Sequence, residues 1–291
     1  MSVKSALKPA YYRALASINL PLRRRLLYAA KHRRWPNLDV PQSFTEKMNW
    51  RIIHDRRPQL AWTCDKLQMK EIARQRSSEL IRIPETYWHG TDVTGLAGIE
   101  LPDHWVLKPT HRSGALVLFG GGQANTDELI LETRRWLDDV NWSALGEWAY
   151  SQAEPRLMIE ELIGVPGTSP TDYKFFVFDG KPELILAVDD RFGQPVKRYY
   201  RPNWSLLGTN GEADTELEPP QNLNKMLDAA ATLGAGFDFM RVDLYDANGE
   251  VWFGELSPYS GSGLTPFVPK SLDDELGALW RLPIQEITDA K

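Results

Sequence analysis

The sequence predicts an α+β protein built on antiparallel sheets. Short runs of alternating apolar and polar residues predict strands, and two pairs of such runs are joined by Asp179-Gly180 and Asn248-Gly249. These dipeptides are strong signals for a tight hairpin, because both central residues of the two-residue turn need a positive φ. The predicted helices do not alternate regularly with the strands, which argues against a parallel βαβ sheet.

The composition is that of an ordinary globular protein. The chain has 291 residues, of which 42% are hydrophobic, enough for a core that divides into lobes. It has no apolar run of about 18 residues and no apolar stretch of signal-peptide type, so we expect a cytoplasmic location. A single cysteine excludes an intrachain disulfide, and five scattered histidines without an H-E-x-x-H pattern argue against zinc. Any metal should therefore be bound by oxygen.

The start of the chain is strongly basic. Residues 1–38 hold nine Lys or Arg and no acid, although the net charge of the chain is −5. We expect a basic helical segment over residues 1–40, which could bind an anionic membrane surface peripherally, with nucleic acid a less favoured partner. A solvated helix packed through its few apolar residues is the alternative.

Helices and strands are then expected in mixed order. The capping box from Ser43 to Glu46 predicts a helix to about His54, and Pro58 is well placed to start another that reaches about Arg76. The remaining expected elements are strands at 105–108, 116–119, 157–162, 173–178 and 184–188, the final hairpin, and helices at 127–139, 223–233 and 272–280.

Asp243 and Glu255 lie on the two arms of the hairpin at Asn248-Gly249. With a two-residue turn, Asp243 lies opposite Gly254 and Glu255 points to the other face. With a three-residue loop, Asp243 pairs with Phe253 and Glu255 becomes its diagonal neighbour on the same face. A site for Mg²⁺ and a polyphosphate needs the two carboxylates together, as in the second register. A surface hairpin with two solvated acids is the alternative.

Lys108 ends a predicted apolar strand, just before a loop that contains His111, Ser113 and Gly114. An ammonium group beside loop N–H groups suits phosphate oxygens. A lysine that only extends its charge into solvent is the alternative.

The strand at 157–162 runs into a linker at Leu162 and Ile163. Free backbone groups there could bind an adenine edge, and Glu160 or Glu161 could take ribose hydroxyls. An ordinary edge strand with two solvated glutamates is the alternative.

Asp172 and Lys174 share one face of the following strand, so Asp172 could be the partner that a buried Lys174 needs. Arg191 could bind a phosphate or a substrate carboxylate with both arms of its guanidinium, although Asp189 and Asp190 offer a simple surface pairing.

Together these motifs resemble the ATP-grasp superfamily, and more closely its TupA-like branch, which is associated with teichuronopeptide synthesis. The resemblance covers about residues 40 to 283. Several motifs in one order are more specific than any one of them. They are Pro41 to Trp50 (PQSFTEKMNW), Asp65-Lys66, Asp172 to Phe176 (DYKFF), Arg241 to Tyr245 (RVDLY) and Phe253 to Leu256 (FGEL).

The resemblance implies an ATP-grasp fold, in which two α+β lobes with antiparallel sheets clasp ATP. The limits implied are 1–40 for the basic helical segment, 41–104 for a helical and mixed region, 105–160 for the first lobe and 161–291 for the second lobe with the metal site.

The resemblance also implies ligands for ATP and Mg²⁺. The nucleotide-binding residues would be Lys66, Lys108, His111, Ser113, Gly114, Glu160, Glu161, Leu162, Ile163, Asp172 and Lys174. The metal-binding residues would be Asp243, Glu255 and Ser257, and the catalytic residues Arg191, Lys174 and Arg241. Arg112 and Ala115 stand where the family's phosphate loop tends to have glycines, and Ser257 stands where many members have a metal-binding Asn.

The implied activity is ATP-dependent ligation of a small carboxylate substrate to an amine substrate through an acyl phosphate. Two other classes stay open, a phosphotransferase acting on a hydroxyl and a non-catalytic nucleotide-binding module. The sequence does not indicate the donor, the acceptor or the oligomeric state.

Overall fold

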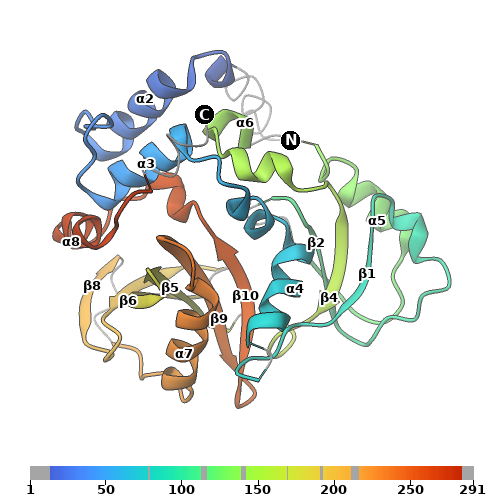
Figure 1. Cartoon of the computed structure of the whole chain (residues 1–291). Helices are drawn as coiled ribbons and strands as arrows, with labels where there is room; N and C mark the ends of the chain where they lie inside the picture. The colour runs from blue at the N-terminus through green and yellow to red at the C-terminus, as the bar shows by residue number, and fades with distance from the viewer. Residues whose placement is uncertain are drawn as a thin grey trace.

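The computed structural model describes residues 14–77, 79–112, 117–138, 142–168, 170–190, 193–210 and 216–283. Figure 1 shows two sheets with helices around and between them. The helices are α2 (Leu20–His32), α3 (Phe44–His54), α4 (Lys66–Ser77), α5 (Thr126–Thr133), α6 (Trp142–Leu145), α7 (Leu223–Gly234) and α8 (Ser271–Leu279). Short 3-10 segments are η1 (Pro58–Leu60), η2 (Trp62–Cys64), η3 (Val93–Leu96), η4 (Trp148–Gln152) and η5 (Ser260–Gly263).

Every pair of neighbouring strands in the two sheets is antiparallel, so the fold class is α+β as expected. The first sheet has four strands in the order β1 (Thr86–Gly90), β4 (Leu157–Glu161), β2 (Trp105–Pro109) and β3 (Leu118–Gly120). The second has six strands in the order β10 (Glu250–Ser257), β9 (Phe239–Ala247), β5 (Asp172–Phe178), β6 (Lys181–Asp189), β7 (Val196–Tyr200) and β8 (Leu206–Asn210).

Helix α3 begins at the expected place because its capping box forms. The Ser43 hydroxyl accepts a hydrogen bond from the Glu46 backbone N–H, and the Glu46 carboxylate accepts one from the Ser43 N–H. These two bonds satisfy backbone donors that the first helical turn leaves free. The cap places the buried Phe44 ring against the aromatic rings of Phe176 and Phe239.

The single helix expected from Pro58 to Arg76 is wrong, because the chain forms η1, η2 and then α4. Asp65 explains the restart, since its carboxylate accepts hydrogen bonds from the backbone N–H groups of Leu67 and Gln68. A side chain that caps the first turn in this way starts a new helix. Lys66 therefore lies at the first position of α4.

Strands β1, β7 and β8 have no counterpart among the expected elements. Each has five residues; β1 pairs with the more apolar β4 and β7 with the longer β6, while β8 pairs with β7 at the edge of its sheet. Their pairing depends on these neighbours, which a local sequence pattern does not record.

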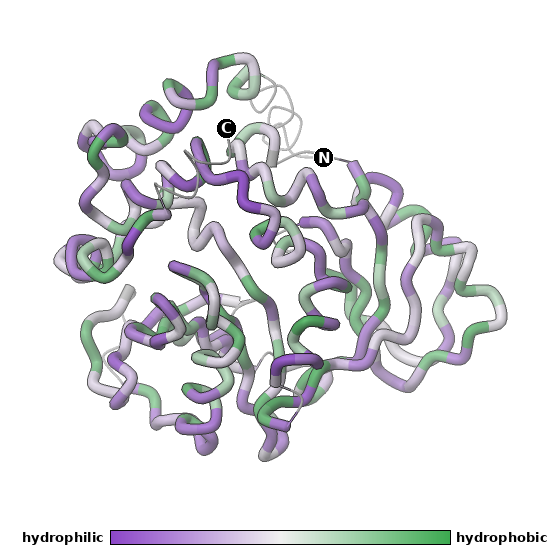
Figure 2. Tube along the Cα trace, in the orientation of Figure 1, coloured by the Kyte–Doolittle hydropathy of each residue, from purple (hydrophilic) through white to green (hydrophobic). Residues whose placement is uncertain are grey.

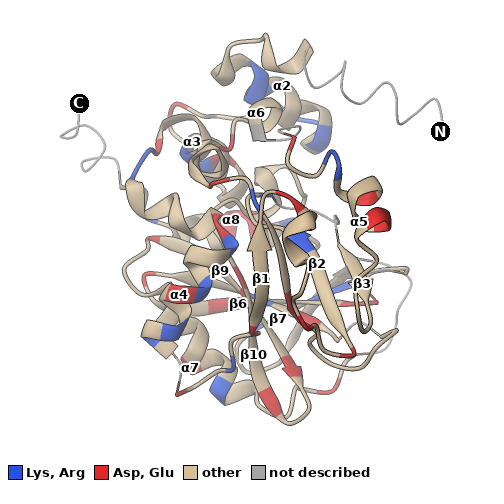
Figure 3. Ribbon diagram, turned by 90° about the vertical axis from the view of Figure 1, so that its right-hand side faces the viewer, with Lys and Arg blue, Asp and Glu red and all other residues tan. Residues whose placement is uncertain are grey.

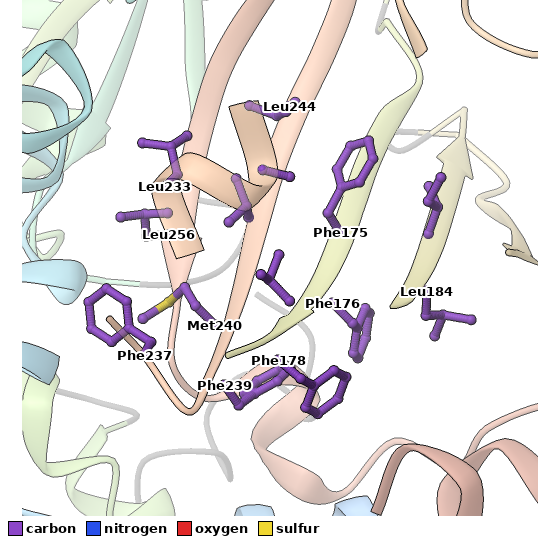
Figure 4. Close-up of a cluster of buried hydrophobic side chains, with 14 of the residues drawn as sticks. Phe175, Phe176, Phe178, Leu184, Leu233, Phe237, Phe239, Met240, Leu244 and Leu256 are labelled. Carbon is purple, nitrogen blue, oxygen red and sulfur yellow. The ribbon is translucent and has the colours of Figure 1, made fainter. Parts of the chain in front are cut away.

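The six-stranded sheet has one apolar face, and its other face is apolar at one end of β5 and polar at the other. Helix α7 packs on the apolar face, where Gly234 lies against Val177 and leaves no room for a side chain. Figure 4 shows Leu233 of α7 in one buried cluster with Phe175 and Leu244 of the sheet. On the opposite face, α3 covers Phe176, while Asp172 and Lys174 occupy the other end of β5. This polar end positions the candidate site.

The basic helix α2 packs against the rest of the protein. Figure 2 shows hydrophilic and hydrophobic residues mixed along it, and Figure 3 shows its basic residues. Arg23 is 6% exposed and Arg24 is fully buried, while Arg34 pairs with Glu46 at 2.5 Å. Arg23 and Arg24 are therefore buried within the protein, and the membrane contact expected for the basic segment stays a prediction. Residues 1–13 lie outside the described chain. None of the described helices has the length and hydropathy needed to cross a membrane.

Candidate active site

The β9–β10 hairpin brings Asp243 and Glu255 together by a route that neither expected register describes. The turn has two residues, with positive φ at Asn248 (56°) and Gly249 (76°). This turn alone would place Asp243 opposite Gly254, but the register shifts at Gly254 and pairs Asp243 directly with Glu255. The shift is a β-bulge, which returns Glu255 to the face of Asp243.

Gly254 is required where it stands. A Cβ atom there would lie 2.8 Å from the backbone oxygen of Asp243 and 2.9 Å from a ring carbon of Tyr245. A glycine inside a strand often marks a bulge or a close backbone approach, so this residue was the sequence signal for the true register.

Two cations bind the carboxylates of the second sheet. Arg241 donates to both Asp243 oxygens at 2.7 and 2.8 Å and to Glu255 Oε1 at 2.7 Å. Lys174, opposite Asp243 on β5, donates to Asp243 Oδ2 at 2.6 Å and to Asp172 Oδ2 at 2.5 Å. These hydrogen bonds form one continuous network across the adjacent strands β5, β9 and β10.

The pairing keeps Asp243 ionised. Burial by itself would raise the pKa of this carboxyl, but Arg241 and Lys174 outweigh burial and lower the pKa to about 2. Burial opposes charge on Arg241 as well, yet Asp243 and Glu255 hold its pKa above the ordinary value. The three carboxylates carry one formal negative charge more than the two cations balance, which leaves the cluster able to attract a further cation.

The donor chemistry fits Mg²⁺ only together with phosphate oxygens. Among the described residues, no group of three or more Asp, Glu, His or Cys could hold a metal alone. Asp243 and Glu255 supply hard oxygen ligands, and Mg²⁺ is commonly held by one or two carboxylates plus substrate phosphates. Ser257 shares the face of Glu255, lies opposite Arg241 and is 5% exposed.

The first sheet holds a second charged cluster around Glu160 of β4. Its carboxylate pairs with Lys108 of β2 and with Lys70 of α4, the latter at 2.9 Å. Burial would raise the pKa of Glu160, but Lys108 and Lys70 lower it. Glu160 therefore fixes two lysines, a use that differs from the ribose contact expected for it.

Lys70 was not among the residues singled out from the sequence. It lies four positions after Lys66, so both lysines are on one face of α4. Its Nζ also donates to Thr86 Oγ1 of β1 at 2.8 Å. The spacing of the two lysines was the signal that could have identified it.

The linker after β4 has mixed roles. Glu161 Oε1 pairs with Arg82 at 2.7 Å, and its Oε2 accepts from the Glu85 N–H at 3.1 Å. Leu162 and Ile163 follow the strand and are half-buried.

Lys66 interacts electrostatically with both charged clusters. Its Nζ donates to the Arg112 backbone oxygen at 2.5 Å, and its backbone N–H donates to Thr110 O at 3.0 Å. Burial lowers the pKa of Lys66 to about 8, with Glu255 of the second sheet opposing and Lys108 of the first sheet assisting the shift. This lysine therefore responds to the charges of both sheets.

His111 is buried in a polar environment without using its polar atoms. It is 2% exposed, and neither ring nitrogen has a hydrogen-bond partner within the described part of the chain. Burial, with the nearby charges of Arg112 and Lys66, lowers its pKa to about 4. A buried unpaired imidazole is costly, which favours a ligand that completes its hydrogen bonds. Ser113, Gly114, Ala115 and Arg191 lie outside the described residues.

Comparisons with solved structures found matches at low identity. The chain is similar to D-alanine–D-alanine ligase from Bacillus anthracis complexed with ATP (19% identity, TM-score 0.43, covering 78% of this chain and 65% of that chain). It is similar to D-alanine–D-alanine ligase from Helicobacter pylori (15%, 0.44, 76% and 61%) and to the ATP-grasp ligase PsnB complexed with minimal precursor (14%, 0.38, 80% and 63%). The chain thus spans less than two thirds of the length of each.

The search of curated proteins found no match. A family model described as TupA-like ATP-grasp matches residues 46–281, which include both sheets and both charged clusters. The chain belongs to the TupA-like ATP-grasp family.

Proposed function

We propose that the protein is an ATP-dependent carboxylate–amine ligase that uses Mg²⁺ and forms a peptide-like amide bond. Membership in the TupA-like ATP-grasp family supports ATP-dependent ligase chemistry in general. The observation that carries the proposal is the direct pairing of Asp243 with Glu255, with Arg241 hydrogen-bonded to both. A fixed array of carboxylates and cations is suited to a charged phosphoryl group in transfer.

The nucleotide would be held between the two charged clusters. Lys66, Lys108 and His111 are the proposed phosphate contacts, because two are cations and the third is a buried donor without a partner among the described residues. Asp243 and Glu255, with Ser257 beside them, are the proposed metal ligands. When bound, Mg²⁺ would neutralise charge on the phosphate oxygens.

The reaction needs no protein nucleophile. A substrate carboxylate oxygen forms a bond to the γ-phosphorus of ATP, and ADP leaves with the electron pair of the broken P–O bond. The amine nitrogen then bonds to the acyl carbon, inorganic phosphate leaves, and the amine gives up a proton. Lys174 and Arg241, with Arg191 as the third proposed catalytic residue, would stabilise the negative charge on the transferred group.

A substrate screen tests this function. Pairs of carboxylates and amines, including amino acids, are incubated with MgATP, and ADP, phosphate and product masses are measured. We expect ADP and phosphate in equal amounts with an amide product, and at least about a hundredfold lower turnover in Asp243→Asn and Glu255→Gln. Arg25→Met, a change on the surface of α2, is the matched control and should keep the parent rate.

Other products would contradict the ligase assignment. A stable phosphorylated hydroxyl compound would identify a phosphotransferase. ATP binding without turnover across the screen would identify a binding module. Parent-level turnover in both carboxylate variants would remove the proposed metal role.

A further inference from the structure

We propose that Arg24 of α2 is a positioning residue that fixes the loop after the metal-binding strand and so aligns the two charged clusters. This inference rests on the proposed metal role of β10. Helix α2 precedes residues 46–281, which match the family, so Arg24 lies in the part of the chain outside the family match.

The Arg24 guanidinium is fully buried and joins three separate segments. Its Nε donates to Asn49 Oδ1 of α3 at 2.8 Å, and its Nη1 donates to the Leu145 backbone oxygen at 3.1 Å. Its Nη1 and Nη2 also donate to the hydroxyl and the backbone oxygen of Ser262 in η5. A planar group with donors in a fixed fork is suited to hold several acceptors at once.

The loop that Arg24 holds has an unusual backbone. Gly261, Ser262 and Gly263 follow one another in left-handed conformations, with φ of 55°, 54° and 61°. Such a conformation costs a residue with a side chain about 1–2 kcal/mol, so Ser262 needs support from its surroundings. Arg24 supplies that support from one side. Asn49 supplies it from the other, since its Nδ2 donates to the Gly263 oxygen at 2.9 Å.

The held loop continues the strand that carries the metal ligands. Glu255 and Ser257 are the last site residues of β10, and η5 begins three residues later at Ser260. Between them, the Tyr259 hydroxyl accepts a hydrogen bond from the Ala149 N–H of η4 at 3.3 Å. A displacement of η5 would therefore also displace the end of β10, because only two residues separate them.

Arg24 also acts on the segment that leads into the other sheet. Leu145 and Glu147 precede η4, which leads into β4 and its Glu160. Glu147 is 4% exposed, and burial raises its pKa while Arg24 and a hydrogen bond from Ser262 lower it. One guanidinium thus joins the approach to β4 with the continuation of β10, the two strands that carry the opposed clusters.

Nucleotide binding with and without metal tests this role. Calorimetry measures the affinity for AMPPNP, a non-hydrolysable ATP analogue, in EDTA and in Mg²⁺, for the parent, Arg24→Met and Arg24→Lys. The Mg²⁺-dependent gain is the ratio of AMPPNP affinity in Mg²⁺ to that in EDTA. We expect this gain to be about tenfold smaller in Arg24→Met than in the parent, a difference of about 1.4 kcal/mol, while the affinity in EDTA stays within about twofold of the parent's. Arg24→Lys should recover part of the loss, because an ammonium reaches fewer of the acceptors.

Arg25→Met is the matched control, because Arg25 is the next residue of α2 and pairs with Asp39, whose side chain is 86% exposed. It should keep the full gain. If Arg24→Met does not fold, Asn49→Asp decides the question, since it keeps the acceptor for Arg24 and removes the amide donor to the Gly263 and Thr45 backbone oxygens. Asn49→Asp should show the same selective loss of the Mg²⁺-dependent gain.

The inference is overturned if the folded variants keep the parent's Mg²⁺-dependent gain. It is also overturned if they lose affinity equally in EDTA and in Mg²⁺, which would show a general structural role. A parent protein whose AMPPNP affinity does not respond to Mg²⁺ would contradict the proposed function and, with it, the alignment role.

Discussion

At the scale of single residues, Lys66 makes the most direct pH prediction. Burial lowers its pKa from 10.5 to about 8, so in the free protein about half of the molecules carry a neutral Lys66 at that pH. Phosphate oxygens favour the ammonium form, so AMPPNP binding should take up a proton near pH 8–9, and the affinity should fall as the pH rises further. The stability of the fold changes in the opposite direction. Burying the charged Lys66 destabilises the fold at low pH, and this cost disappears as the pH rises from the folded pKa of about 8 to the unfolded value of 10.5.

Calorimetry in two buffers of different ionisation enthalpy measures this proton uptake. Lys66→Arg should abolish it, because a guanidinium stays protonated throughout. Lys31→Arg, a change at an exposed position of α2, is the control and should behave as the parent. Equal proton uptake in Lys66→Arg and the parent would place the titrating group elsewhere.

At the scale of elements, the bulge at Gly254 decides whether the hairpin can form a metal site. Gly254→Ala would force its Cβ against the backbone of Asp243 and the ring of Tyr245. We expect a loss of about 1–3 kcal/mol of unfolding free energy and a large loss of Mg²⁺-dependent AMPPNP affinity, because Glu255 moves away from Asp243.

Gly249→Ala in the turn of the same hairpin is the matched control. Its φ of 76° makes alanine costly by about 1 kcal/mol, but a Cβ there meets no atom within 4 Å. Urea denaturation should show that both variants are destabilised, while only Gly254→Ala weakens metal-dependent binding. Equal binding losses would show that the bulge has no special role.

At the scale of the whole molecule, we expect the charged residues of the two sheets to bind one nucleotide although Lys108 and Asp243 have separate ion-pair partners. Lys108 pairs with Glu160 in the first sheet, whereas Asp243 pairs with Lys174 and Arg241 in the second. In a double-mutant cycle of Lys108→Met and Asp243→Asn, the stability effects should add within about 0.5 kcal/mol. Their effects on MgAMPPNP affinity should not add, because a shared nucleotide couples them. Additive binding losses would contradict a common site.

The sequence alone determined the features that depend on neighbouring residues. The capping box at Ser43, the turns at Asp179-Gly180 and Asn248-Gly249, and the α+β class follow from local backbone chemistry, and the order of motifs indicated the family. Only the tertiary structure decided the direct pairing of Asp243 with Glu255, the use of Glu160 to hold two lysines, and the burial of Arg24. The physical reason is range. Caps and turns act over about four residues, whereas the bulge register and the partners of a buried charge depend on segments brought together only by folding.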